Sequence, residues 1–171
     1  MQHQITKQQI YLDHAATTPL SETAGAAMEA CLYEPYGNPS SMHQIGRQAY
    51  DALYANRRTL AEALSADPDE VILTGSGTES DNLALLGLAR QHREHGNHIV
   101  ISAIEHKAVL AAAKQLEREG FSVTRLPVDA TGMVSVVDLQ TALRPETILV
   151  SIMYANNEIG TVEPIGDVVQ V

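Results

Sequence analysis

Short runs of apolar and β-branched residues alternate along this chain with longer segments whose apolar residues recur every three or four positions. The short runs, each expected to form a strand, are residues 71–73, 98–104, 123–128 and 147–153. The longer segments, each expected to contain a helix, lie at residues 21–33, 45–64, 83–88, 109–116 and 135–144. Strands and helices that alternate in this way predict an α/β fold, with a mainly parallel sheet flanked by helices.

The composition narrows the classes of partner that this chain can have. Hydrophobic residues make up 44% of the 171 residues and charged residues 19%, which is typical of a globular protein. Asp and Glu outnumber Lys and Arg by 21 to 11, so the formal net charge is −10. Because an acidic surface repels phosphate backbones and anionic lipids, we expect neither nucleic acid nor a membrane as a partner.

The cysteine content and the N-terminal residues indicate whether to expect disulfides, metal clusters or a membrane location. The one cysteine, Cys31, excludes an internal disulfide and a cysteine-based metal cluster, and no other metal cluster is indicated. Cys31 lies on an apolar stripe of the segment 21–33, so we expect a buried, inert thiol. The first ten residues lack an apolar signal core, and no apolar run reaches the ~20 residues of a membrane span, which favours a cytoplasmic protein.

A glycine-rich turn, TGSGTES at residues 74–80, joins an expected strand to an expected helix. The N–H groups at the start of that helix, together with the Thr78 hydroxyl, would bind an anion such as a phosphate. The alternative is an ordinary tight turn in which Ser76 and Glu79 form a capping box, and glycine content alone does not separate the two. The dinucleotide fingerprint matches imperfectly, because no acidic residue closes the next strand at the usual spacing, so a mononucleotide-sized or monophosphate ligand is favoured.

Two other expected strands also end in polar residues. His106 follows the strand 98–104, where an imidazole can stack on a flat ligand or move a proton. Asn156 and Asn157 follow the strand 147–153, where an amide can donate to an anionic oxygen. Each of these has an ordinary structural explanation, a helix cap for the histidine and a turn for the asparagines. Because parallel strands end at one edge of a sheet, we nevertheless expect the three polar turns to lie together.

Five blocks of residues resemble one known family in its own order. They are YLDHAATTP at 11–19, GNPSS at 37–41 with His43, Gly46 and Arg47, GTESDN at 77–82, EHKAV at 105–109, and VSIM at 150–153 with NNEIG at 156–160. Over nearly its whole length the chain resembles the cysteine desulfurases, which are class V aminotransferase-like enzymes of fold type I that use pyridoxal 5′-phosphate (PLP).

The resemblance implies roles for four residues. Gly77 and Thr78 would bind the PLP phosphate, His106 would stack on the pyridine ring and is the candidate catalytic acid–base group, and Asn157 would hydrogen-bond the phenolic oxygen. It also implies a homodimer that converts L-cysteine to L-alanine and leaves the sulfur on an enzyme cysteine as a persulfide. A sulfur-acceptor or scaffold protein, in iron–sulfur cluster assembly or tRNA thiolation, would then take the sulfur.

The family is roughly twice as long as this chain, so we expect the N-terminal portion of such a protein. Residues 1–16 would reach toward a small domain, and residues 17–171 would be the first part of the large PLP-binding domain. The Schiff-base lysine and the nucleophilic cysteine would follow residue 171, since Lys107, Lys114 and Cys31 match neither position. Three alternatives stay open: a fragment that only folds or dimerises, a related PLP lyase such as a selenocysteine lyase, and a nicotinamide-binding dehydrogenase.

We therefore predict that the 171-residue chain by itself does not release alanine from L-cysteine when PLP is added. The reason is that the lysine and the cysteine that the resemblance requires have no counterpart in the sequence. Quantifying alanine in a reaction with the purified chain tests this prediction. Alanine formation that grows with the concentration of the chain would contradict it.

Overall fold

The computed structural model describes residues 10–171. The chain divides into two compact units, which we call unit 1 (Met1–Leu73) and unit 2 (Thr74–Val171). The expectation that residues 1–16 reach toward a second domain falls largely on residues 1–9, which lie outside the described residues, and it stays a prediction. In the part of the chain that the structure describes, no helix is both long enough and apolar enough to span a bilayer.

Unit 1 consists of helices joined by irregular segments, as the periodicity predicts. Its elements are α1 (Glu22–Tyr33), α2 (Gln44–Leu64) and the short 3₁₀ helix η1 (Pro68–Glu70). Ser21 begins α1, since its hydroxyl accepts a hydrogen bond from the N–H of Ala24 (3.2 Å). Ser65 ends α2 in a left-handed conformation, with φ at 54°.

The expectation of a buried thiol is wrong, because Cys31 is exposed. The apolar stripe of α1 exists, but none of the residues of this helix is buried. An apolar stripe becomes buried only where another element packs on it, and sequence periodicity does not show whether such an element is present.

The expectation of a strand at residues 71–73 is also wrong. These residues are not part of a β-ladder, and the side chains of Ile72 and Leu73 are 68% and 51% exposed. A strand needs a neighbour that completes its hydrogen bonds, and none of the described residues pairs with this segment. The apolar run therefore leads into unit 2 as an extended, unpaired segment.

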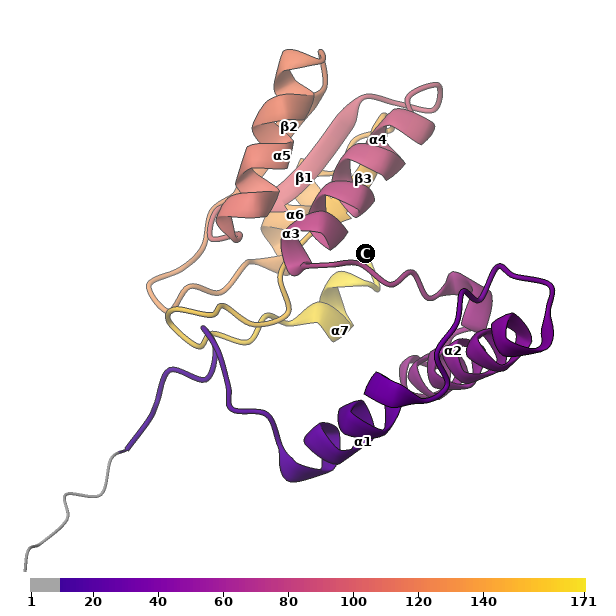
Figure 1. The fold of residues 1–171 in the computed structure, drawn as a ribbon. Helices are drawn as coiled ribbons and strands as arrows, with labels where there is room; N and C mark the ends of the chain where they lie inside the picture. The colour runs from indigo at the N-terminus through magenta and orange to yellow at the C-terminus, as the bar shows by residue number, and fades with distance from the viewer. Residues whose placement is uncertain (1–9) are drawn as a thin grey trace, which may run out of the picture. The chain divides into compact units, whose positions relative to one another are not determined.

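Unit 2 contains a parallel sheet of three strands. They are β1 (His98–Ser102), β2 (Ser122–Leu126) and β3 (Thr147–Ser151). The strand order is β2-β1-β3, and both pairings of β1 are parallel, with His98 opposite Ser122 and Ile101 opposite Ser151 (Figure 1). This sheet confirms the predicted α/β fold class, although β1, β2 and β3 each end two residues before the expected boundary.

Helices cover both faces of the sheet in unit 2 (Figure 1). Their bounds are α3 (Gly77–Asn82), the π-helical turn η2 (Leu83–Gly87), α4 (Leu88–Gln91), α5 (Lys107–Arg118), α6 (Val136–Ala142) and α7 (Ile165–Val168). Ile99 and Ile101 of β1 pack against α5 and the helix that runs from α3 to α4. Val100 faces the opposite side, where it packs with Leu139 of α6. Because alternate residues of β1 enter different cores, the whole strand is buried.

Two buried positions in β1 are polar, His98 and Ser102. His98 is fully buried, and its two ring nitrogens lie 2.7 Å from the hydroxyl of Thr147 and 2.8 Å from that of Thr124. These two threonines belong to β3 and β2, so the imidazole bridges both neighbours of the central strand. Burial lowers the pKa of His98, and the positive charge of Arg144 adds to this effect.

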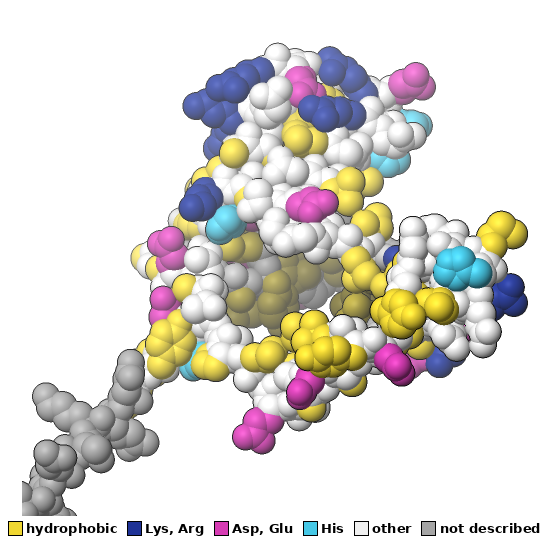
Figure 2. Space-filling model, in the orientation of Figure 1, with side chains coloured by type: hydrophobic (Ala, Val, Ile, Leu, Met, Phe, Trp, Pro, Cys, Tyr) yellow, Lys and Arg dark blue, Asp and Glu magenta, His cyan; other side chains and the backbone are white. Residues whose placement is uncertain are grey.

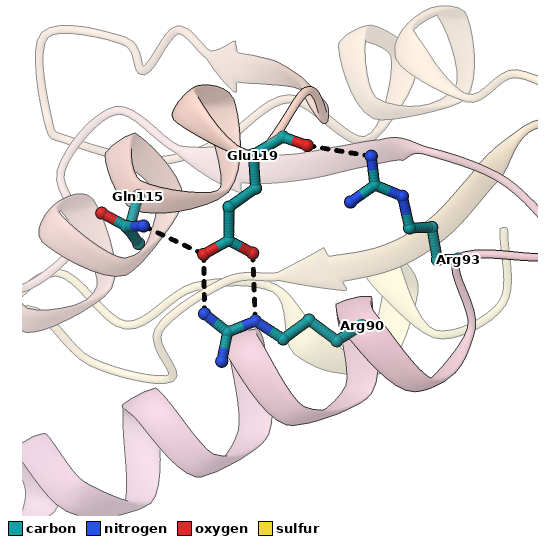
Figure 3. A network of polar contacts seen from close by, with 4 residues as sticks. All are labelled: Arg90, Arg93, Gln115 and Glu119. Atoms are coloured by element: carbon teal, nitrogen blue, oxygen red, sulfur yellow. Dashed lines mark hydrogen bonds and ion pairs between the residues drawn. The ribbon is translucent and has the colours of Figure 1, made fainter.

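A polar network joins the C-terminal ends of α4 and α5 (Figure 3). The Arg90 guanidinium donates two hydrogen bonds to the Glu119 carboxylate (3.0 and 2.6 Å), Gln115 donates a third (2.9 Å), and Arg93 donates to the Glu119 carbonyl (2.9 Å). Basic side chains gather at this end of unit 2 (Figure 2), which suits the negative ends of the helix dipoles. The hydrogen bonds from Arg90 and Gln115 lower the pKa of Glu119 from 4.5 to about 2.

We predict that Glu119→Gln lowers the melting temperature at neutral pH, because the bidentate ion pair with Arg90 is lost. A carboxylate whose pKa falls on folding stabilises the protein above its unfolded pKa of 4.5, and that stabilisation disappears as the pH falls toward about 2. Thermal melts of both proteins between pH 7 and pH 2 should therefore converge in acid. Glu94→Gln, an exposed carboxylate of the same unit, is the control, and a constant gap across the pH range would contradict the account.

Candidate active site

The glycine-rich turn forms the start of α3 and caps it. The Ser76 hydroxyl accepts a hydrogen bond from the N–H of Glu79 (3.2 Å), and the Glu79 carboxylate accepts one from the N–H of Gly75 (2.7 Å). Ser76 therefore caps the helix, but the expected capping box is incomplete, because Glu79 accepts from the N–H of Gly75 and not from that of Ser76. The N–H groups of Gly77 and Thr78 take part in no hydrogen bond between described residues, as expected for the first turn of a helix.

His106 is the N-cap residue of α5. Its Nδ1 atom accepts a hydrogen bond from the N–H of Ala108 (3.2 Å), which orients the ring. Because Nδ1 acts as an acceptor, the hydrogen of the neutral ring is on Nε2. The side chain is exposed, so the ring face and Nε2 are accessible.

The carboxylate of Glu105, beside His106, is buried, with only 6% of the residue exposed. Its Oε1 atom accepts hydrogen bonds from the Ser102 hydroxyl (2.7 Å) and from the backbone N–H of Met153 (2.8 Å). Burial raises the pKa of Glu105 and outweighs these bonds, and the negative charge of Asp81 in α3 contributes to the rise. Glu105 thereby connects the end of β1 to the segment that follows β3.

Asn156 organises the turn that follows β3. Its Oδ1 atom accepts hydrogen bonds from the N–H groups of Glu158 (2.8 Å) and Ile159 (3.1 Å). Its Nδ2 atom donates to the carbonyl oxygen of Ile104 (3.1 Å), in the loop that carries His106. The neighbouring Asn157 is exposed, and its amide takes part in no hydrogen bond between described residues. Asn156 thus shapes the turn, while the amide of Asn157 stays available to a ligand.

His106 and Asn157 line the same cleft, which has a volume of about 470 Å³. The residues around it are Ile104, Glu105, His106, Lys107, Asn156, Asn157, Glu158 and Ile159. Gly77 and Thr78 are not among them, but they begin α3, which packs against α5. Figure 1 shows the starts of both helices and the loop after β3 at one end of unit 2.

No role was expected for Glu105, and the only structural role expected for Asn156 was in a turn, without its hydrogen bond to the carbonyl oxygen of Ile104. Both were visible as polar residues at strand ends, within the motifs that include His106 and Asn157. Which of two adjacent polar residues turns inward depends on the local backbone, so the motif alone did not separate the residue that supports the loop from the residue that faces the cleft.

Residues 10–171 match the protein family described as Aminotransferase class-V. The chain belongs to this family. The match covers both units, and it agrees with the resemblance found in the five sequence blocks.

Curated class V relatives include several proteins named cysteine desulfurase IscS. The protein from Dictyoglomus turgidum (strain DSM 6724 / Z-1310) is 50% identical over 159 residues, which are 93% of this chain and 40% of that relative. The protein from Methanosarcina thermophila is 48% identical over 159 residues, again 93% of this chain and 39% of the relative. The chain therefore spans about 40% of the length of these relatives.

Solved structures with the same fold lead to the same family. A structure named NIFS-LIKE PROTEIN superposes with a TM-score of 0.91 at 37% identity, covering 95% of this chain and 45% of that one. A second, named SspA in complex with cysteine, has a TM-score of 0.86 at 39% identity, covering 92% and 46%. Both likenesses agree with the predicted α/β fold, and this chain covers less than half of each of these structures.

Because Glu105 is buried, its contribution to the stability of the protein should depend on pH. A carboxyl group whose pKa rises on folding favours the folded state below its unfolded pKa, and this advantage is lost as the pH rises through the folded pKa. Glu105→Gln keeps an oxygen acceptor but removes the buried charge. We expect the variant to be at least as stable as the parent at pH 8, with the difference shrinking toward pH 4.

Thermal melts of the two proteins across this pH range measure the effect. A Glu105→Gln variant that is clearly less stable than the parent at pH 8 would show that the ionised carboxylate is stabilising after all. The exposed residue Glu94, changed to Gln, reports the effect of losing one negative charge without burial.

Proposed function

We propose that this chain forms part of the PLP site of a cysteine desulfurase. The observation that carries the proposal is the cleft shared by His106 and Asn157 in a class V aminotransferase chain. Gly77 and Thr78, at the start of α3, complete the proposed set of cofactor-binding residues.

The groups at these positions fit the chemistry of PLP. At the start of α3, two backbone N–H groups that have no partner among residues 10–171 and the Thr78 hydroxyl are suited to a phosphate. A methyl group added at Gly77 would meet no atom of the described part of the chain within 4 Å, so the space beside this glycine is open for an anion to approach. An accessible imidazole and an accessible amide in the cleft are suited to a flat ring that carries an oxygen.

Each residue has a distinct task in this proposal. Gly77 and Thr78 hold the phosphate and so fix one end of the cofactor. His106 packs against the ring, and its Nε2 atom is positioned to hold or transfer a proton, because Nδ1 is occupied by the N–H of Ala108. Asn157 donates a hydrogen bond to the phenolic oxygen. PLP itself, when bound, supplies the electron sink for the chemistry at the substrate amine.

For the whole protein we propose the conversion of L-cysteine to L-alanine, with the sulfur passed first to an enzyme cysteine as a persulfide and then to an acceptor or scaffold protein. The names of the curated relatives and the solved complex of SspA with cysteine support this substrate. We also propose that the protein acts as a homodimer in the cytoplasm, in iron–sulfur cluster assembly or tRNA thiolation. Lys107 and Lys114 match no position for the Schiff-base lysine, so the 171 residues alone are proposed to be inactive.

A pair of glycine substitutions tests the phosphate site. Gly77 and Gly87 lie in one helical run, and an added Cβ at either position would meet no atom within 4 Å. Alanine stabilises a helix by about 0.5–1 kcal/mol relative to glycine, so both variants should fold at least as well as the parent. Gly77→Ala should nevertheless bind PLP more weakly, roughly tenfold, because the methyl group occupies the space where the phosphate approaches the backbone.

Calorimetric titration of each variant with PLP, alongside thermal melts, makes the measurement. Gly87→Ala should bind PLP as the parent does. If Gly77→Ala binds PLP with the parent's affinity while remaining folded, the phosphate does not lie at the start of α3.

A further inference from the structure

The loop after β1 and the turn after β3 exchange hydrogen bonds in both directions. Glu105, in the loop after β1, accepts a hydrogen bond from the backbone N–H of Met153 (2.8 Å). Asn156, in the turn after β3, donates one to the backbone carbonyl of Ile104 (3.1 Å). Each segment therefore contributes one side chain to the backbone of the other, and we call these two hydrogen bonds the reciprocal clamp.

The positions of the clamp residues suggest what the clamp does. Glu105 immediately precedes His106, and Asn156 immediately precedes Asn157. The clamp residues are the less exposed member of each pair: Glu105 is buried and Asn156 is partly buried, whereas His106 and Asn157 are exposed. Each segment thus uses one polar residue to hold the backbone and presents the next residue to the cleft.

The clamp is also anchored to the sheet. The Ser102 hydroxyl, at the end of the fully buried strand β1, donates to the same Glu105 oxygen that accepts from Met153 (2.7 Å). Asn156 additionally accepts hydrogen bonds from the N–H groups of Glu158 and Ile159, which shape its own turn. Loss of either clamp bond would leave a polar group unpaired and free the two segments to move apart.

We propose that Glu105 and Asn156 are positioning residues that set the spacing between His106 and Asn157, and so the affinity of the site for the ring of PLP. The inference rests on the proposed function. The clamp should affect binding of the PLP ring but not binding of the phosphate. The protein groups that are proposed to bind the phosphate belong to α3 and take part in neither clamp bond.

Three substitutions in the clamp and one control substitution elsewhere in unit 2 test the roles of the two hydrogen bonds. Glu105→Leu removes the acceptor with little change in volume, whereas Glu105→Gln retains an oxygen that can accept from Met153. Asn156→Asp removes the donor to Ile104 but keeps the oxygen that accepts from Glu158 and Ile159. Asn97→Asp, at an exposed asparagine of unit 2, is the matched control for the change in charge.

The test measures the affinity of the full-length gene product for PLP and, separately, for inorganic phosphate. Glu105→Leu and Asn156→Asp should each weaken PLP binding roughly two- to tenfold, the range that one hydrogen bond contributes, without changing phosphate binding. Glu105→Gln and Asn97→Asp should bind both as the parent does. Because both clamp bonds hold the same spacing, the double variant should lose less than the product of the two single losses.

Amide hydrogen exchange without any ligand provides a second readout. The N–H of Met153 should exchange faster in Glu105→Leu than in Glu105→Gln, since only the latter retains its acceptor. If the parent binds PLP no more tightly than phosphate, the proposed function fails. Two results would overturn the clamp proposal and leave the proposed function standing, provided that the parent binds PLP tightly. In the first, Glu105→Leu and Asn156→Asp bind PLP as tightly as the parent does. In the second, they lose affinity for PLP and for phosphate together.

Discussion

The candidate site depends on the burial of β1 between two neighbouring strands and two layers of helices. All five residues of β1 are buried, and this strand is hydrogen-bonded to β2 on one side and to β3 on the other. Because all three strands are parallel, the segments that follow β1 and β3 leave the sheet at the same edge. The spacing between His106 and Asn157 is therefore determined first by a rigid sheet and only then by the loops that carry them.

Polar groups on β1 and just beyond it make this arrangement specific. His98 is bridged to the hydroxyls of Thr124 and Thr147, and Ser102 donates to Glu105. A buried polar group without a partner costs about 1–3 kcal/mol, so each of these bonds disfavours other pairings of the strands. At the edge of the sheet, the same principle positions Glu105 and Asn156, whose partners lie in each other's loops.

The sequence predicted the parts of the structure that depend on local pattern. The three strands of unit 2, the helical run from α3 to α4, and the helices α5 and α6 follow from periodicity, whereas α7 was not expected. The sequence did not predict that residues 71–73 are unpaired or that Cys31 is exposed. Burial of these residues would require packing partners, and a local sequence pattern does not show whether such partners are present. Likewise, His106 and Asn157 could be proposed as site residues from their motifs, whereas the supporting bonds of Glu105 and Asn156 depend on segments about 50 residues apart.

We propose that a glycine turn, an imidazole and an amide in unit 2 bind one PLP molecule together. A crystal structure of the protein with PLP bound tests this most directly. We expect the phosphate to lie at the N–H groups of Gly77 and Thr78, the ring to pack against His106, and the phenolic oxygen to lie within hydrogen-bonding distance of Asn157. A cofactor that contacts only one of these elements, or that binds elsewhere on the protein, would contradict it.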